Sequence, residues 1–469
     1  MAKDMTKKHK DYGKWAARWR EINDICDGEN LRTYLVPLNP SDTSKENQDR
    51  NDQYFRRAVF YGIGGYTSRG MVGMLFKKWP TLTVPTGLEY TKFNADGAGL
   101  SIYQQSQSLA RDLVRLGRSG IWVDYPDVGD VASVADMQQG RIFAVCRHFS
   151  PVDILDWQEE QIGARVRISR VVLADTILDD EGEEIEVRIE LFMDGNAYTV
   201  REWQQSNAGW EITREAVPRD ASGSTWDEIP FLFAGAEANN PNIDQPPMRD
   251  IVRINIGHFN NSASYEDSIF FAGQVQPWMS GISEDYIELL NKNNMYVGSG
   301  RLLGVPSGET FGFAQAQPNQ ALKEAMLDKV DMAIGLGAMF IQPGSAAKTA
   351  TQIAGEQQIS HSILSLIASN VSEAYTQALK WMARYMGAPE DNLVYEVTQD
   401  FVDPVATPQE LQAIVASMLQ GAVPFSDFVS WSQRHGYIDP EKTPDQVAEE
   451  VGRGSPMPDL GGADNAQNA

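Results

Sequence analysis

The stretch from residue 318 to 387 constrains the fold of this 469-residue chain more than any other part. Between about Thr351 and Met386 no proline interrupts the sequence, and apolar residues recur at three- or four-residue spacing. This pattern predicts one very long amphipathic helix, which spans roughly 50 Å at about 1.5 Å per residue. Thr349 or Thr351 can cap its start, and Gly387 predicts its end.

A loop rich in small residues precedes the long helix. Residues 342–350 combine Gly, Pro, Ser and Ala with a single cation, Lys348. That composition is typical of mobile surface loops. A shorter helix over 318–338, which carries Lys323 and Lys329, is expected before it.

The composition excludes several classes of protein. The chain has 64 Asp and Glu against 40 Lys and Arg, a formal net charge of −24, which disfavours tight nonspecific binding of nucleic acid by the whole surface. Only Cys26 and Cys146 occur, which gives no disulfide framework and fits a reducing compartment. No apolar run approaches the ~18 residues of a membrane span, and no signal peptide opens the chain. We therefore expect a soluble protein.

The first half of the chain predicts helices followed by an antiparallel sheet. Glycines in the second helical stretch are expected to let helices pack closely. Six later segments are expected to be strands, and several of them alternate with period two. The expected elements are a Trp-bearing helix over 11–28, a polar loop over 39–52, a helical stretch over 54–79, a helix over 100–116, a buried strand at 121–123 and strands between 143 and 216.

A run of carboxylates lies within the predicted sheet. Between Asp175 and Glu190 eight carboxylates surround a single Arg188. Paired carboxylates can act as acid and base or bind a metal. This run flanks a predicted hairpin tip at 179–182, so the favoured interpretation is a solvated charged turn.

A small unit interrupts the helices of the second half. Residues 230–247 predict a boundary loop, residues 247–271 a helix, and residues 274–317 two strand-like stretches around a capped helix. The small unit has too few apolar residues to close a core of its own, so we expect it to pack on a neighbour, which can be the next copy of the chain. Its main apolar residues are Trp278, Ile287, Leu290, Leu302 and Phe311.

No motif for catalysis, metal binding or cofactor binding is found. The five histidines are scattered, and H-E-x-x-H, C-x-x-C, the phosphate-binding G-x-x-x-x-G-K-[ST] loop and the G-x-S-x-G elbow are missing from the sequence. We therefore predict no catalytic residue, no metal site and no cofactor, and a protein that is not an enzyme.

Several stretches together resemble the portal, or head–tail connector, proteins of tailed bacteriophages. The resemblance covers most of the chain in the same order and rests on the series rather than on one motif. The stretches are Trp19 with 24–28, 54–76, 95–126 with its Val-Asp-Tyr-Pro strand, SPVDILDW at 150–157, 246–267, 348–351, and 400–401 with 423–438.

The resemblance implies an α+β portal-type fold. Its segments would be a mixed α/β wing (1–246), a first stem helix (247–271), a clip (272–317), a second stem helix (318–338), a tunnel loop (339–350), a long helix (351–387), a wing strand and linker (388–406), a helical crown (407–453) and a disordered tail (454–469).

The function implied is a conduit for double-stranded DNA. About twelve copies would form a ring at one capsid vertex of the virion, after assembly in the host cytoplasm. The implied partners are the terminase large subunit, a head–tail adaptor, the major capsid protein and a scaffold, with no membrane. Lys323 and Lys329 are candidate channel-lining residues, and the apolar clip residues are a candidate oligomer or terminase interface. The tunnel loop facing DNA would contain Gln342, Pro343, Gly344, Ser345, Ala346, Ala347, Lys348 and Thr349.

Two alternatives stay open. Another oligomeric virion protein, such as a capsid or adaptor subunit, would lack the order of helix, clip and helix. A hydrolase would use the carboxylates of residues 175–190. For Lys348 the alternative is a mobile linker whose lysine faces solvent.

Overall fold

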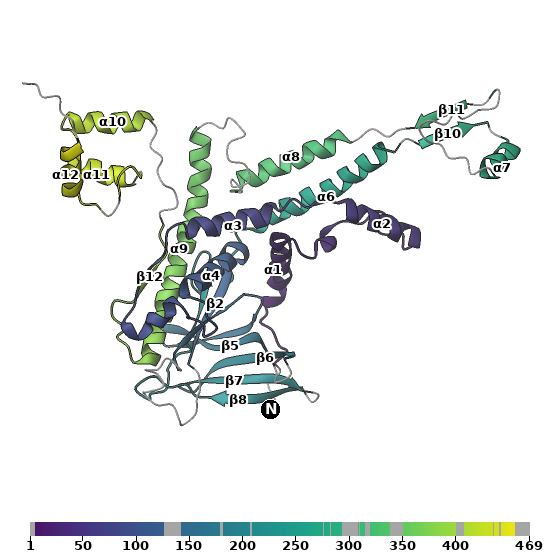
Figure 1. The fold of residues 1–469 in the computed structure, drawn as a ribbon. Coiled ribbons are helices and arrows are strands. Elements are labelled where there is room, and N and C mark those ends of the chain that lie inside the picture. Colours follow the sequence, from purple (N-terminus) through teal and green to yellow (C-terminus); the bar gives the residue numbers. More distant parts are fainter. Residues whose placement is uncertain are drawn as a thin grey trace, which may run out of the picture. The chain divides into compact units, whose positions relative to one another are not determined.

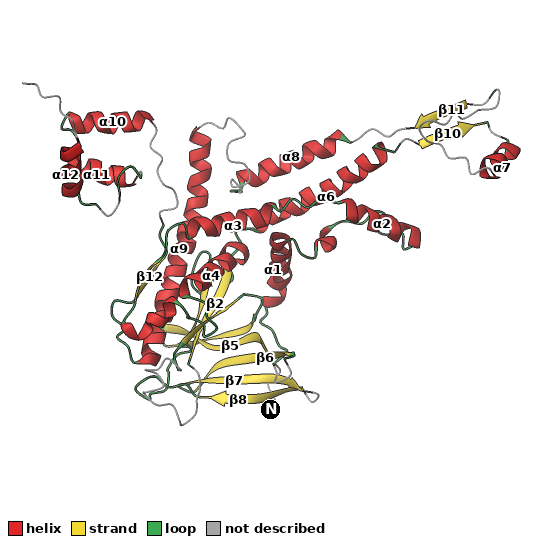
Figure 2. Ribbon diagram, viewed as in Figure 1, coloured by secondary structure: helices red, strands yellow, loops and turns green. Residues whose placement is uncertain are grey.

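The structure is a computed structural model with helices and strands in separate groups, an α+β fold (Figures 1 and 2). The chain forms two compact units, residues 1–399 and 400–469, which are described separately. The described residues are 5–125, 142–178, 182–206, 209–274, 276–281, 283–292, 308, 310–314, 319–337, 350–399, 408–434, 436–439 and 442–454.

The first helix confirms the prediction from the tryptophan pattern. Helix α1 (Tyr12–Asp27) buries Trp19, whose indole Nε1 donates a hydrogen bond to the Leu116 carbonyl oxygen at 3.2 Å. It ends at Gly28, which adopts the left-handed conformation (φ 75°) that glycine tolerates best. A 3-10 turn (Leu31–Tyr34) follows.

Helix α2 (Lys45–Arg57) occupies much of the predicted polar loop over 39–52, so that prediction was wrong. The helix is almost entirely polar and therefore lacks the apolar period of a packed helix. The Ser44 side chain caps its start by accepting a hydrogen bond from the Asn47 backbone nitrogen. The buried Asn47 and Asn51 side chains then bond to loop carbonyls such as that of Leu38, which fixes the helix without an apolar stripe.

The predicted helical stretch over 54–79 is also divided. Helix α2 ends at Arg57, residues 58–62 are not helical, and α3 (Ile63–Leu75) begins after Gly62. The expectation of close packing through glycine is confirmed at Gly65, where an added Cβ would lie 2.1 Å from the Cys26 carbonyl oxygen.

Two antiparallel sheets form the body of the first unit (Figure 2). A three-stranded sheet has the order β3 (Val145–Phe149), β2 (Arg118–Asp124), β9 (Phe231–Gly235). Strand β9 falls inside the predicted boundary loop, so that part of the prediction was wrong, because its short apolar run pairs with β2 and is buried there. A five-stranded meander contains β4 (Ile154–Ile162), β5 (Arg165–Leu178), β6 (Glu184–Asp194), β7 (Ala197–Ser206) and β8 (Gly209–Ala216).

The predicted long helix is present as α9 (Ala350–Met386) and has 37 residues. Gly387, which follows its last residue, has a φ of 64°. Its C-terminal half packs with α4 (Ile102–Leu116), and the Tyr375 hydroxyl on α9 donates to the Gln105 side chain on α4 at 3.2 Å. A two-stranded sheet of β1 (Thr81–Thr83) and β12 (Val394–Glu396) lies beside α9, and a 3-10 helix (Thr86–Lys92) follows β1.

A helical hairpin leads from the sheets to the small unit (Figure 1). Helix α6 (Arg249–Ala272) runs outward and α8 (Gln320–Gly335) returns beside it. Between them the chain forms β10 (Gln276–Ser280), α7 (Glu284–Lys292) and β11 (Thr310–Ala314), with β10 antiparallel to β11. We call α6 and α8 the arm and residues 272–317 the clip.

The second unit contains three helices, α10 (Pro408–Leu419), α11 (Phe425–Arg434) and α12 (Pro444–Gly454). Val429 and Val447 are buried between α11 and α12. None of the helices in the described ranges of either unit is long and apolar enough to cross a membrane.

Candidate functional site

The two stem lysines lie on α8 but in different surroundings. Lys323 is exposed, whereas Lys329 is partly buried. The aliphatic chain of Lys329 packs against α6. A Cβ added to Gly257 on α6 would lie 3.0 Å from the Lys329 Cε atom. Burial and the nearby Lys329 lower the pKa of His258, the neighbour of Gly257. The Lys329 side chain therefore helps to hold the arm together, and its role in a channel stays a prediction.

Several large apolar residues of the clip are exposed in the single chain, whereas Phe311 is partly buried. Trp278 is 44% exposed, Ile287 42% and Phe313 59%. Trp278 packs on Gly312 across the β10–β11 pair, and the Phe311 and Phe313 rings lie 5.0 Å apart. Such surface on a unit this small is expected to be covered by another protein surface.

Part of the predicted site cannot be placed. Leu302 and the predicted tunnel loop, Gln342 to Thr349, lie outside the described residues. Leu290 belongs to α7, but its side chain is also outside them. Their assignments stay predictions from the resemblance.

Helix α2 braces the outer part of α6, a feature that the sequence did not predict. Arg50 and Arg57 both donate to the Asp267 carboxylate, with one Arg50 bond of 3.0 Å and the Arg57 bond of 2.6 Å. Burial alone would raise the pKa of Asp267, but these hydrogen bonds lower it below its usual value. The same guanidinium groups lie over the rings of Phe271 and Phe270 at 4.8 and 4.1 Å. The arm is thus tied to the N-terminal part of the unit by ion pairs.

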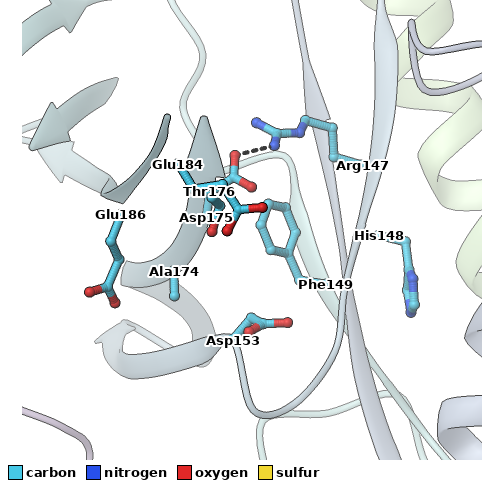
Figure 3. A pocket seen from close by; sticks show the side chains of 9 residues that line it. All are labelled: Arg147, His148, Phe149, Asp153, Ala174, Asp175, Thr176, Glu184 and Glu186. Atoms are coloured by element: carbon cyan, nitrogen blue, oxygen red, sulfur yellow. Dashed lines mark hydrogen bonds and ion pairs between the residues drawn. The ribbon is translucent and has the colours of Figure 1, made fainter. Parts of the chain in front are cut away.

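An open pocket of about 520 Å³ lies between β3 and the β5–β6 hairpin (Figure 3). Asp153, Asp175, Glu184 and Glu186 line it, and Asp175 pairs with Arg147 at 2.5 Å. Within the described ranges, no group of three or more His, Cys, Asp or Glu side chains is arranged to hold a metal ion. The pocket has the character of a solvated acidic hollow.

Several carboxylates of residues 175–190 belong to ion pairs. Asp175 pairs with Arg147, and Glu186 pairs with Arg188 at 2.5 Å. Of the predicted hairpin tip at 179–182, residues 179–181 lie outside the described residues. Glu190 departs from the predicted solvated turn, because it is fully buried and bonded to Arg170.

The raised pKa of Asp153 predicts that the stability of the chain depends on pH. Burial, with Asp112 and Asp175 nearby, raises its pKa to about 6. The folded chain therefore binds more protons than the unfolded chain between the ordinary carboxyl pKa of about 3.9 and pH 6, so stability falls as the pH rises through that window. D153N is expected to reduce this fall and to be more stable than the wild type at pH 7. Burial also raises the pKa of Asp124 to about 6, so Asp124 would contribute the part of the fall that remains in D153N.

Urea denaturation at pH 4, 5, 6 and 7 measures this effect. E184Q is the control, because Glu184 lines the same pocket but is exposed, and it should follow the wild-type curve. A D153N curve parallel to that of the wild type would rule out the assignment.

Arg118 is a second buried charge that the sequence did not reveal. Its side chain is 1% exposed, and its guanidinium carbon lies 4.1 Å from the centre of the Trp157 ring and 3.8 Å from that of the Phe233 ring. Burial lowers the pKa of Arg118 to about 9. In the described part of the chain its guanidinium nitrogens have no hydrogen-bond partner. His9 stacks on Trp157 at 3.7 Å, so the N-terminal segment covers this stack. A cation stabilised by aromatic faces is a structural element of the core.

Comparison with known proteins places part of the chain in context. A family model described as a domain of unknown function, DUF4055, matches residues 247–386, the segment from α6 to the end of α9. Among curated proteins, none matches the sequence.

Two solved structures resemble the chain at low similarity. A chain from the neck of an empty GTA particle computed with C6 symmetry is 13% identical with a TM-score of 0.41, over 82% of this chain and 93% of that one. A chain from the neck of a native GTA particle computed with C12 symmetry is 14% identical with a TM-score of 0.40, over 80% of this chain and 89% of that one. Similarity at this level carries no argument about function.

Proposed function

We propose that this chain is a structural protein of a phage-like particle, and specifically its portal subunit. In this proposal copies form a closed ring at one capsid vertex, and double-stranded DNA passes through the ring during packaging and ejection. The terminase, the head–tail adaptor and the capsid protein would dock on it. Its role would be mechanical rather than catalytic.

One observation carries the proposal: α6, the clip elements and α8 follow one another along the chain, with α6 and α8 paired in the arm, before the long helix α9 begins. A capsid or adaptor subunit is not expected to have this order. The sequence resemblance requires the same order and was derived from other stretches as well, such as 95–126 and 150–157.

The clip supports assembly through its exposed surface. Trp278, Ile287 and Phe313 present large apolar side chains on a unit whose described residues form a two-stranded sheet and one short helix. Two-stranded sheets are at best marginally stable alone. A head-to-tail contact, in which each copy covers the clip of its neighbour, closes into a ring when the rotation allows it.

The charge of the chain fits a conduit. With a net charge of −24 the surface should repel the phosphate backbone, so DNA would slide rather than bind. Lys348 in the predicted tunnel loop would be a local exception that meets phosphates transiently. Weak, salt-sensitive duplex binding by the purified protein is the corresponding expectation.

Deletion of residues 280–312 tests the proposal by removing most of the clip while leaving the arm. Size-exclusion chromatography with light scattering should find a closed oligomer for the full chain and a folded monomer for the deletion. W278S, which changes one exposed indole, should weaken assembly without unfolding the protein. A full-length chain that stays monomeric would contradict the proposed function, whereas a deletion that still forms the wild-type oligomer would contradict only the role of the clip.

A further inference from the structure

An acidic stripe runs along the outward face of α8. Glu324, Asp328 and Asp331 are exposed and follow the spacing i, i+4, i+7, which places them on one side of a helix. The opposite side of α8 carries the buried Val330 and Ala333 and packs against α6. In the described part of the chain none of the three carboxylates has an ion-pair or hydrogen-bond partner for its side chain.

Large apolar side chains flank this stripe. Leu327 is 57% exposed, Met332 59% and Leu336 50%. Leu327 and Met332 lie on α8 and Leu336 directly follows it, and together they form a surface that another protein is expected to cover. DNA is a poor match for it, because carboxylates repel phosphates and the neighbouring side chains are apolar.

A complementary basic feature lies on the other helix of the arm. Arg249 and Arg253 on α6 are four residues apart and therefore share a face. Arg253 is exposed and Arg249 partly buried, and in the described ranges neither guanidinium forms an ion pair. Asp250 is exposed beside them, so the local charge of this face is positive by one unit.

One acid and one arginine, Asp331 and Arg253, lie at similar heights along the arm. The two helices run in opposite directions, and Lys329 lies against Gly257. Counting residues along both helices from that contact places Arg253 level with Ala333. Asp331 is two residues from Ala333, which is ~3 Å along the arm at the helical rise of about 1.5 Å per residue. Copies related by rotation about an axis along the arm would place residues of equal height opposite one another.

We infer that the arms of neighbouring copies contact each other through these features. Asp331, near one end of the stripe on α8 of one copy, faces Arg253 on α6 of the next, and Leu327 and Met332 are covered in the same contact. The interface is heterologous, since one side supplies an acid and the other supplies an arginine, and charges so arranged fix the partner and its register. The inference rests on the proposed ring and names a contact within it.

Charge reversal tests the pairing. R253E and D331R are each expected to raise the concentration at which the oligomer half-dissociates at least tenfold, measured by analytical ultracentrifugation of the full chain. The double variant R253E/D331R should return to within about threefold of the wild type, because the pair is restored with opposite polarity. K323E, which reverses an exposed charge of α8 outside the stripe, is the control and should assemble like the wild type. Circular dichroism should show all variants folded, since the changed side chains are exposed.

The outcomes separate this inference from the proposed function. If the wild type and both single variants form the same ring with equal stability, the arm contact is overturned while the ring stands. If the single variants weaken assembly and the double variant does not recover, direct pairing of Arg253 with Asp331 is overturned. If D331R leaves assembly unchanged and raises duplex affinity, the stripe faces DNA instead. A wild type that forms no ring overturns the proposed function together with the inference.

Discussion

Replacing Arg170 by alanine is expected to lower the free energy of unfolding by about 3–5 kcal/mol, because it leaves two buried carboxylates without their cation. Arg170 on β5 donates to Asp156 on β4 and to Glu190 on β6, each at 2.6 Å. Asp156 is 4% exposed and Glu190 is fully buried. A single guanidinium thus joins three strands of the five-stranded sheet.

Urea denaturation of R170A and of a matched variant, R214A, measures this contribution. Arg214 pairs with Glu202 at 2.8 Å in the same sheet, but both side chains are about one-third exposed. Loss of such a pair should cost at most ~1 kcal/mol, because water screens it. If R170A cost no more than R214A, the buried triad would not stabilise the sheet as described.

G65A is expected to destabilise the chain by about 1–3 kcal/mol or more, although alanine is the better helix former. The added Cβ would lie 2.1 Å from the Cys26 carbonyl oxygen and 3.2 Å from its carbonyl carbon. Both atoms belong to the backbone of α1, so relief requires α1 and α3 to move apart.

G73A in the same helix is the matched control. A Cβ at Gly73 would meet no atom within 4 Å. The substitution should therefore stabilise the chain by about 0.5–1 kcal/mol, the difference in helix propensity between glycine and alanine. Thermal unfolding of both variants decides the point, and shifts of the same sign and size would contradict the close approach of α1 and α3.

Elements with a strong apolar period could be predicted from the sequence, whereas elements held by polar contacts could not. Helix α9 followed from its uninterrupted spacing and from Gly387, and α1 from its tryptophans and Gly28. Helix α2 was missed because side-chain hydrogen bonds of Asn47 and Asn51 fix it rather than an apolar stripe. Strand β9 was missed because the flanking prolines and asparagines outweighed its short apolar run, which is stabilised by pairing with β2 and by packing against α9.

The candidate site was predictable in outline and not in its contacts. The order of arm and clip could be read from proline, glycine and helix-capping signals. The sequence could not show which of the two lysines on α8 packs on α6, because Lys329 meets Gly257 only through the tertiary arrangement of the two helices. The burial of Glu190 was equally hidden, since its partner Arg170 lies across the sheet and 20 residues away in sequence.

Electron microscopy of the purified full-length protein tests the central claim most directly. The account predicts ring-shaped particles with rotational symmetry and a central opening wide enough for a B-form DNA duplex. Particles that are monomeric, that form open filaments, or that close without a central opening would contradict the proposal that this chain is a DNA conduit.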